Sequence, residues 1–149
     1  MIFIKVKRIS QDFSDIPLPK YATEGSSGMD IRAAVSEKIE ILPNKFTVVP
    51  TNLIFEIPNG YEIQVRPRSG LAANNGIGIL NSPGTIDSDY RGELKVILFN
   101  FSDKAFAINR GDRIAQIVIN KIFKSNLEEV TDISKTERGE GGFGHSGKH

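Results

Sequence analysis

Alternation of apolar and polar residues over short segments is the feature of this sequence that most restricts its fold. Residues 61–66 alternate cleanly, as expected of a strand with one face in a core and the other in solvent. Further strands are predicted at residues 1–7, 46–49, 53–57, 94–101 and 114–123. The last two are almost entirely apolar, which predicts strands that are buried on both faces.

Glycine and proline separate the predicted strands, with 14 Gly and 7 Pro in 149 residues. Turns are expected at residues 43–44, 58–60, 74–76 and 109–112. The only convincing helix signal is short and begins at Ser69, whose hydroxyl is expected to cap one or two turns. Many short strands with regular turns predict a single all-β domain: a sandwich, a barrel or a jelly roll.

Composition excludes several classes of protein. A net charge of +1 argues against general nucleic-acid binding. Zero cysteines exclude disulfides, thiol catalysis and thiolate metal sites, and fit a reducing compartment. No apolar run approaches the roughly 20 residues of a membrane span, so we expect no membrane association and a cytoplasmic location.

Residues 84–94 follow a turn and are bracketed by glycines, which predicts a tight β-hairpin. Its arms would place the Asp87 carboxylate near the Tyr90 ring. A carboxylate can activate water as a general base, and a tyrosine ring packs against a sugar or base. The pair suggests hydrolysis of a flat, phosphorylated molecule. The alternative is that Asp87 and Asp89 are ordinary turn residues, that Tyr90 is a core aromatic and that Asn81 only ends a strand.

Residues 66–72 combine arginines at a strand end with a helix start. Helix N-termini favour phosphate, and we expect the backbone of Ser69 and Gly70 to approach an anion beside Arg68. The alternative is a helix cap next to solvated arginines. Gln116 lies in an apolar run, so its amide needs partners: either local backbone or a ligand. Asp112 and Arg113 are interpreted as a surface ion pair.

The last twelve residues change character and are rich in glycine. We expect a jelly-roll core at residues 1–137 and a mobile lid at 138–149, in which Phe143 stacks on a base while Arg138 and Ser146 reach phosphate. The alternative is a disordered terminus. The two histidines of this tail lie four residues apart and make a poor metal site without a third ligand.

Taken in order, these segments resemble the five motifs of the trimeric deoxyuridine triphosphate nucleotidohydrolases, or dUTPases. The matching segments are residues 26–33, 67–72, 84–94 preceded by Asn81, 111–116 and 138–147. The resemblance covers Tyr21 to the C-terminus. His145 stands where many members have serine or threonine, which leaves its contact open.

The resemblance implies a jelly-roll or β-clip sandwich with one short helix. It also implies a homotrimer with an exchanged C-terminal arm and active sites built from more than one chain. The implied reaction is hydrolysis of dUTP to dUMP and pyrophosphate, which limits uracil in DNA and supplies dUMP for thymidylate synthesis. Mg²⁺ is expected as the cofactor, held mainly by the substrate phosphates and not directly by protein ligands.

The resemblance also assigns roles to individual residues. Asp87 is the expected catalytic base, and Tyr90 packs under the deoxyribose. Asp30 matches a motif position whose role, site support or subunit contact, stays open. The other expected substrate contacts are Asn81, Thr85 and Ile86 at uracil; Lys95 on the returning arm; Arg68, Ser69, Gly70 and Gln116 at phosphates; and Arg138, Phe143, Gly144 and Ser146 in the lid.

Two other functions compete with this one. A deoxycytidine triphosphate deaminase on the same jelly roll would normally need a glutamate near the base and would release ammonia. A non-enzymatic β-sandwich that binds nucleotides would need neither the carboxylate at Asp87 nor an aromatic lid.

Overall fold

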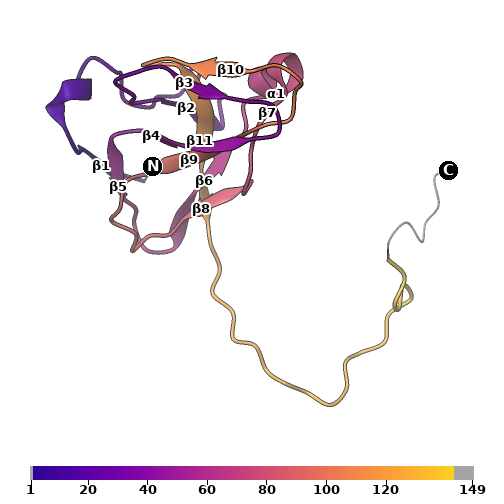
Figure 1. The fold of residues 1–149 in the computed structure, drawn as a ribbon. Helices are drawn as coiled ribbons and strands as arrows, with labels where there is room; N and C mark the ends of the chain where they lie inside the picture. Colours follow the sequence, from indigo (N-terminus) through magenta and orange to yellow (C-terminus); the bar gives the residue numbers. More distant parts are fainter. Residues whose placement is uncertain (1, 143–149) are drawn as a thin grey trace.

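A computed structural model describes residues 2–142 of the chain, and β-strands dominate that part. One α-helix and one 3₁₀-helix interrupt them (Figure 1). In chain order the elements are β1 (Lys5–Arg8), η1 (Gln11–Phe13), β2 (Gly28–Arg32), β3 (Ile39–Ile41), β4 (Phe46–Pro50), β5 (Leu53–Glu56), β6 (Tyr61–Arg66), α1 (Ser69–Asn75), β7 (Ile77–Ile79), β8 (Gly84–Ile86), β9 (Lys95–Asn100), β10 (Phe106–Ile108) and β11 (Arg113–Lys121).

The strands form two larger sheets and two short ribbons. The four-stranded sheet has the order β2-β11-β6-β8, and the three-stranded sheet has the order β4-β9-β7. The ribbons pair β1 with β5 and β3 with β10, and all these pairings are antiparallel. Neighbours in a sheet are often distant in sequence, as in a jelly roll. The prediction of a single all-β domain with one short helix is therefore confirmed.

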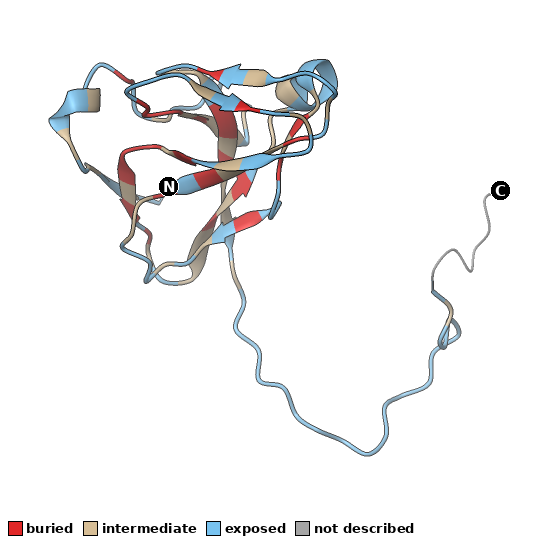
Figure 2. Cartoon of the chain, in the orientation of Figure 1, coloured by how far each residue is buried: buried red, intermediate tan, exposed pale blue. Residues whose placement is uncertain are grey.

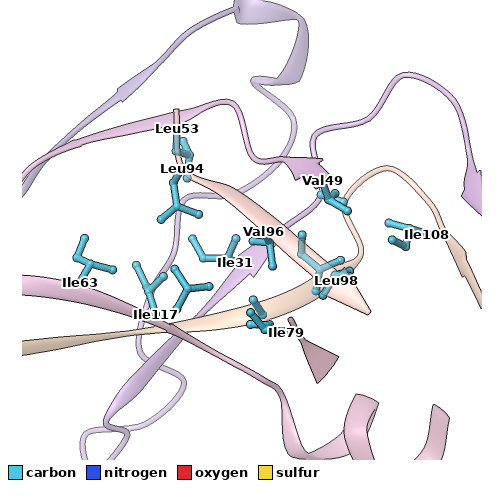
Figure 3. Close-up of a cluster of buried hydrophobic side chains, with 14 of the residues drawn as sticks. Ile31, Val49, Leu53, Ile63, Ile79, Leu94, Val96, Leu98, Ile108 and Ile117 are labelled. Carbon is cyan, nitrogen blue, oxygen red and sulfur yellow. The ribbon is translucent and has the colours of Figure 1, made fainter. Parts of the chain in front are cut away.

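The inner faces of the two larger sheets meet in one hydrophobic core. Figure 2 shows buried residues recurring along the strands, and Figure 3 shows their side chains gathered between the sheets. Burying each such side chain contributes roughly 1.5–3 kcal/mol. The central members are Ile31, Ile63 and Ile117 from the four-stranded sheet and Val49, Val96 and Leu98 from the three-stranded sheet.

Most predicted strands are found, with three differences. Strand β11 ends at Lys121 and not at Phe123, and it is not buried on both faces, because Val118 and Ile119 are half-exposed. The first strand begins at Lys5 and not at the N-terminus. Strand β9 is not buried on both faces: Val96 and Leu98 are buried, whereas Ile97 and Phe99 are half-exposed. The outer face of its sheet carries apolar side chains that the described residues do not cover, so the strand is less buried than its apolar sequence predicts.

Each of the four predicted turns contains a residue with positive φ, which confirms them. These residues are Asn44 (φ 56°), Gly60 (85°), Gly76 (64°) and Gly111 (80°).

The predicted helix exists, but Ser69 does not cap it. The capping position belongs to Arg68, which makes no side-chain capping hydrogen bond. The Ala72 N–H donates to the Arg68 carbonyl at 3.0 Å, so the helical hydrogen-bond pattern starts one residue earlier than predicted. Within residues 2–142, none of the helices has the length and apolar character needed to cross a membrane.

An arginine clamp holds the loop after β1 against the turn before β11. The Arg110 guanidinium donates to both carboxylate oxygens of Asp15, at 3.1 and 2.5 Å, and to the Asp12 carbonyl. It also lies 4.4 Å from the centre of the Phe13 ring. The hydrogen bond from Arg110 holds the pKa of the Asp15 carboxyl below its ordinary 3.8. The clamp is therefore strongest when Asp15 is ionised.

Replacing Asp15 by Asn should lower stability at neutral pH but not in acid. A carboxyl whose pKa is lowered by folding contributes stability above its ordinary pKa of 3.8, and that contribution disappears as the pH falls through the lower folded value. Urea midpoints of parent and variant should differ at pH 7 and converge below the folded pKa. Asp103→Asn, at an exposed site, is the matched control. A difference that persists unchanged in acid would contradict the clamp.

Candidate functional site

A narrow cleft separates strands β8 and β9. Strand β8 pairs with β6 along one edge only. Strand β9 pairs with β4 and, up to the Ile79–Leu98 pair, with β7. The Ile97 carbonyl still accepts from the Leu80 N–H at 2.9 Å. Beyond it, the edges of β8 and β9 that border the cleft have no partner strand among the described residues, so backbone groups there can bind a ligand. The lining residues are Val65, Ile79, Asn81, Gly84, Thr85, Ile86, Lys95, Val96 and Ile97.

The cleft replaces the predicted hairpin at residues 84–94. Strands β8 and β9 belong to different sheets, and no ladder joins them among the described residues. The prediction of a tight hairpin was therefore wrong, because each strand finds a partner from elsewhere in the chain. A slot between two unpaired strand edges leaves room for a flat ring, whereas a closed hairpin does not.

Asp87 and Tyr90 lie in the loop that follows β8. Asp87 comes directly after the last cleft residue of β8 and is exposed. The Tyr90 N–H donates to the Asp87 carbonyl at 3.2 Å, so one turn holds both residues together. Tyr90 is 44% exposed and is not a core aromatic. A carboxylate and a ring surface are thus both accessible beside the cleft.

A second cluster centres on the Asp30 carboxylate at the edge of the four-stranded sheet. Arg68 Nε donates to one carboxylate oxygen at 2.8 Å, and Arg113 Nη1 donates to the other at 3.2 Å. Two guanidinium groups on one carboxylate leave a net positive charge, which suits an anion such as phosphate. Asp30 therefore supports this cluster, and the predicted Asp112–Arg113 pair is wrong: the Asp112 carboxylate accepts from the Asn109 N–H.

Gln116 joins the same cluster through β11. Its amide Nε2 donates to the Pro67 carbonyl at 2.9 Å, which holds the segment that leads to Arg68. A Cβ at Gly28 would lie 2.3 Å from Gln116 Oε1, so only glycine leaves room for this amide. The backbone interpretation of Gln116 is thus confirmed for its NH₂ group. Ser69 and Gly70 follow Arg68 directly and are exposed.

The register of the four-stranded sheet sets the distance between the two groups. Gln116 lies opposite both Asp30 and Arg66, while Thr85 lies opposite Gln64. Strand spacings near 4.8 Å and rises near 3.3 Å then place Asp87 roughly 16 Å from Gln116 and roughly 20 Å from Asp30, between backbones. One chain therefore cannot bring Asp87 and the arginine cluster to the same phosphate.

The segment after β11 runs away from the body as exposed, extended chain without helix or strand (Figures 1 and 2). Arg138 lies in this segment and donates to the Gly141 carbonyl at 2.7 Å. Phe143, Gly144 and Ser146 lie outside the described residues. The lid therefore stays a prediction.

Two contributors were missed in the sequence. Arg113 was interpreted as a partner of Asp112, although it shares Asp30 with Arg68. Glu93 was not singled out, although it contacts both Asn52 and Lys95 near the loop of Asp87. The only signal for Glu93 in the sequence was its place inside the segment 84–94.

No group of three acidic or histidine side chains within residues 2–142 is arranged to hold a metal ion. The Asp30 carboxylate is already shared by two arginines. A metal that serves this site would need most of its ligands from a bound phosphate chain.

Comparison with known proteins identifies relatives along nearly the whole chain. The dUTPase family model matches residues 14–147. The chain is 54% identical over 145 residues to the deoxyuridine 5′-triphosphate nucleotidohydrolase of Fusobacterium nucleatum, covering 97% of this chain and 98% of that protein. It is 50% identical to the protein of the same name from a Thermoanaerobacter species, covering 98% of each.

Solved structures agree. The dUTPase of Staphylococcus bacteriophage 80alpha, solved with dUPNHPP, superposes with a TM-score of 0.86 at 27% identity and covers 99% of each chain. The match of the family model and of these full-length relatives shows that the chain belongs to the dUTPase family.

Proposed function

We propose that this protein is a dUTP diphosphatase, which hydrolyses dUTP to dUMP and pyrophosphate. The observation that carries the proposal is the slot between β8 and β9, with the exposed Asp87 directly after Ile86, which lines the slot. Family membership and the names of the relatives support the same activity. In the cell this reaction would limit uracil in DNA and supply dUMP for thymidylate synthesis.

The slot is suited to the uracil ring. Backbone N–H and C=O groups present hydrogen-bond donors and acceptors at fixed positions along β8 and β9, at Thr85, Ile86 and Lys95. The Asn81 side-chain amide adds a donor and an acceptor. Cytosine has its donor and acceptor positions exchanged, so it leaves buried polar groups unpaired at a cost of ~1–3 kcal/mol each.

Asp87 then orients and deprotonates the water that attacks the α-phosphate. Its exposed carboxylate lies beside the slot, where the first phosphate after the sugar would lie. Phosphoryl chemistry requires little covalent work from the protein, so positioning and charge neutralisation dominate. Asp87 takes up the proton of the water. The water oxygen bonds to the α-phosphorus, and pyrophosphate departs from the opposite side.

The positive cluster receives the phosphates that leave. Arg68 and Arg113 supply the charge, while Ser69, Gly70 and the remaining N–H of Gln116 supply donors. Family membership implies a divalent metal in general, and Mg²⁺ fits because it binds phosphate oxygens and keeps most of its water. It would be held mainly by the triphosphate, whose negative charge it neutralises.

A complete site requires at least two copies of the chain, because the base and the cluster are too far apart in one copy. The outer face of β4 and β9 is apolar and would be covered by a neighbour. Phe46 and Val48 are 59% and 47% exposed, opposite Phe99 and Ile97. Since Ile97 also lines the slot, a copy that covers this face lies beside the site. We propose a homotrimer, in line with the family.

The tail completes the site as an exchanged arm. Residues 138–149 are the lid, joined to the body by the extended residues 122–137. In the lid, Arg138 and Ser146 contact phosphate, Phe143 stacks on the base and Gly144 lets the backbone turn around the ligand. The extended course of residues 122–142 away from the body supports an arm that reaches a neighbour (Figure 1).

Asp87→Asn should lower kcat by about 10²–10⁴-fold, the usual effect of losing a general base, and leave KM nearly unchanged. The amide keeps the shape of the side chain but does not accept the proton of the water. Asp89→Asn, on the same exposed loop, is the matched control and should keep its turnover. Normal turnover by the Asp87 variant would remove Asp87 from the mechanism.

Tyr90→Ala should reduce the preference for dUTP over UTP by about tenfold, since the ring packs where a 2′-hydroxyl would lie. The measurement is the ratio of kcat/KM for the two substrates. Tyr21→Ala removes an equally exposed ring elsewhere (49%) and should leave the ratio unchanged. An unchanged ratio in the Tyr90 variant would refute a role in sugar selection.

Mixing inactive Asp87→Asn subunits with inactive Arg68→Ala subunits should restore activity. If Asp87 and Arg68 come from different copies, about a quarter of the sites in a random 1:1 mixture receive both intact residues. Subunits unfolded and refolded together should regain about that fraction of parent activity, and each variant refolded alone should stay inactive. No recovery in verified mixed oligomers would show that both residues act within one copy.

The deaminase alternative predicts a different product. Incubation with dCTP and with dUTP, followed by assays for ammonia and pyrophosphate, separates the two enzymes and also the non-enzymatic sandwich, which releases neither.

A further inference from the structure

We infer that Glu93 is a positioning residue: through the backbone N–H of Asn52 it fixes the loop that carries Asp87 and Tyr90, and so sets the selectivity for deoxyribose. This inference rests on the proposed function of that loop. It concerns a contact outside the cleft and outside the arginine cluster.

The Glu93 carboxylate is largely enclosed, with 18% of the side chain exposed. One oxygen accepts a hydrogen bond from the Asn52 N–H at 2.8 Å. The other oxygen lies 3.6 Å from Nζ of Lys95, which is the first residue of β9. A single carboxylate therefore links the end of the loop to a turn in another part of the chain and to the lysine that lines the cleft.

Asn52 is a rigid anchor for this contact. It is 4% exposed and has a φ of +62°, in the left-handed region. Its side chain accepts from the Ser10 N–H and donates to the Ser10 carbonyl, each at 2.8 Å. The side chain of Asn52 thus holds the turn to Ser10, while the backbone N–H of Asn52 bonds to Glu93.

The residues beside Asn52 fix the same end of the loop. The Thr51 hydroxyl donates to the Leu94 carbonyl at 2.6 Å, and the Leu94 N–H donates to the Leu53 carbonyl at 2.9 Å. With the Glu93 contact, three hydrogen bonds join the loop end to residues 51–53. The pairing of β8 with β6 fixes the other end. The part between, which carries Asp87 and Tyr90, takes its position from these two ends.

Tyr90 depends on Glu93 directly. The Tyr90 hydroxyl donates to the Glu93 carbonyl at 3.1 Å. A Cβ at Gly92 would lie 2.2 Å from that hydroxyl oxygen, so the ring lies against the Gly92 backbone. The position of the Tyr90 ring therefore depends on the position of the Glu93 peptide group. If that peptide shifts, the ring moves away from the sugar, and the steric exclusion of ribose is lost.

The test compares Glu93→Ala with Glu93→Gln. The amide oxygen of glutamine can still accept from the Asn52 N–H, whereas alanine removes the acceptor. Glu93→Ala should lower the dUTP/UTP ratio of kcat/KM about tenfold, the factor expected for one hydrogen bond, and Glu93→Gln should keep it. Glu40→Ala, an exposed carboxylate on β3, is the matched control.

Two further measurements separate positioning from stability. Asp15→Asn, which loses the contact with Arg110 away from this loop, should lower the unfolding midpoint and leave the ratio unchanged. Amide hydrogen exchange, which needs no activity, should rise across residues 88–94 in Glu93→Ala and stay at the parent level in Glu93→Gln.

The inference is overturned if folded Glu93→Ala keeps the parent ratio and exchange, or if Glu93→Gln behaves like Glu93→Ala. If Glu93→Ala does not fold, the inference rests on Glu93→Gln, and loss of the ratio or of the exchange protection in that variant overturns it. A parent protein that leaves dUTP intact refutes the proposed function instead, and the exchange measurement still tests the anchor.

Discussion

The register of β11 between β2 and β6 is the constraint on which the rest of the structure depends. It places Gln116 opposite Asp30 on one side and Arg66 on the other. The neighbouring Ile117 points to the core and is fully buried. A slip of one residue would expose Ile117 and bury Gln116. Hydrophobic burial therefore fixes the polar site on the opposite face of the same strand.

The same register explains why the site is divided. Asp87 follows β8, which lies two strands away from β11 and is offset along the sheet. In the proposed function, a substrate bridges Asp87 of one copy and the arginine cluster of another. The apolar outer face of β4 and β9 lies beside the slot and is the surface where the copies would meet.

Local features were well predicted from the sequence. Alternation gave the bounds of β6, and asparagine and glycine marked four turns with a left-handed residue, although the one at Asn52 was not predicted. Errors arose where distant residues decide the outcome. The segment 84–94 looks like a hairpin, but the two strands that it connects pair elsewhere. Strand β8 pairs with β6, and β9 pairs with β4 and β7. Ser69 looks like a cap, but the helix starts from the Arg68 carbonyl.

The site was predicted in the same uneven way. The residue types of Asp87, Tyr90 and Arg68 indicate their chemistry, and the family motifs supplied their roles. The role of Asp30 was not accessible, because its ion pairs join positions 38 and 83 residues apart. Nor was that of Glu93, because its partner Asn52 lies 41 residues away.

The central claim is that one substrate bridges two copies of the chain. A crystal structure with Mg²⁺ and a non-hydrolysable dUTP analogue tests it most directly. The account predicts uracil in the slot between β8 and β9 of one copy, with the terminal phosphates on Arg68 and Gln116 of a neighbour. An analogue whose base and phosphates are all held by one copy would contradict it.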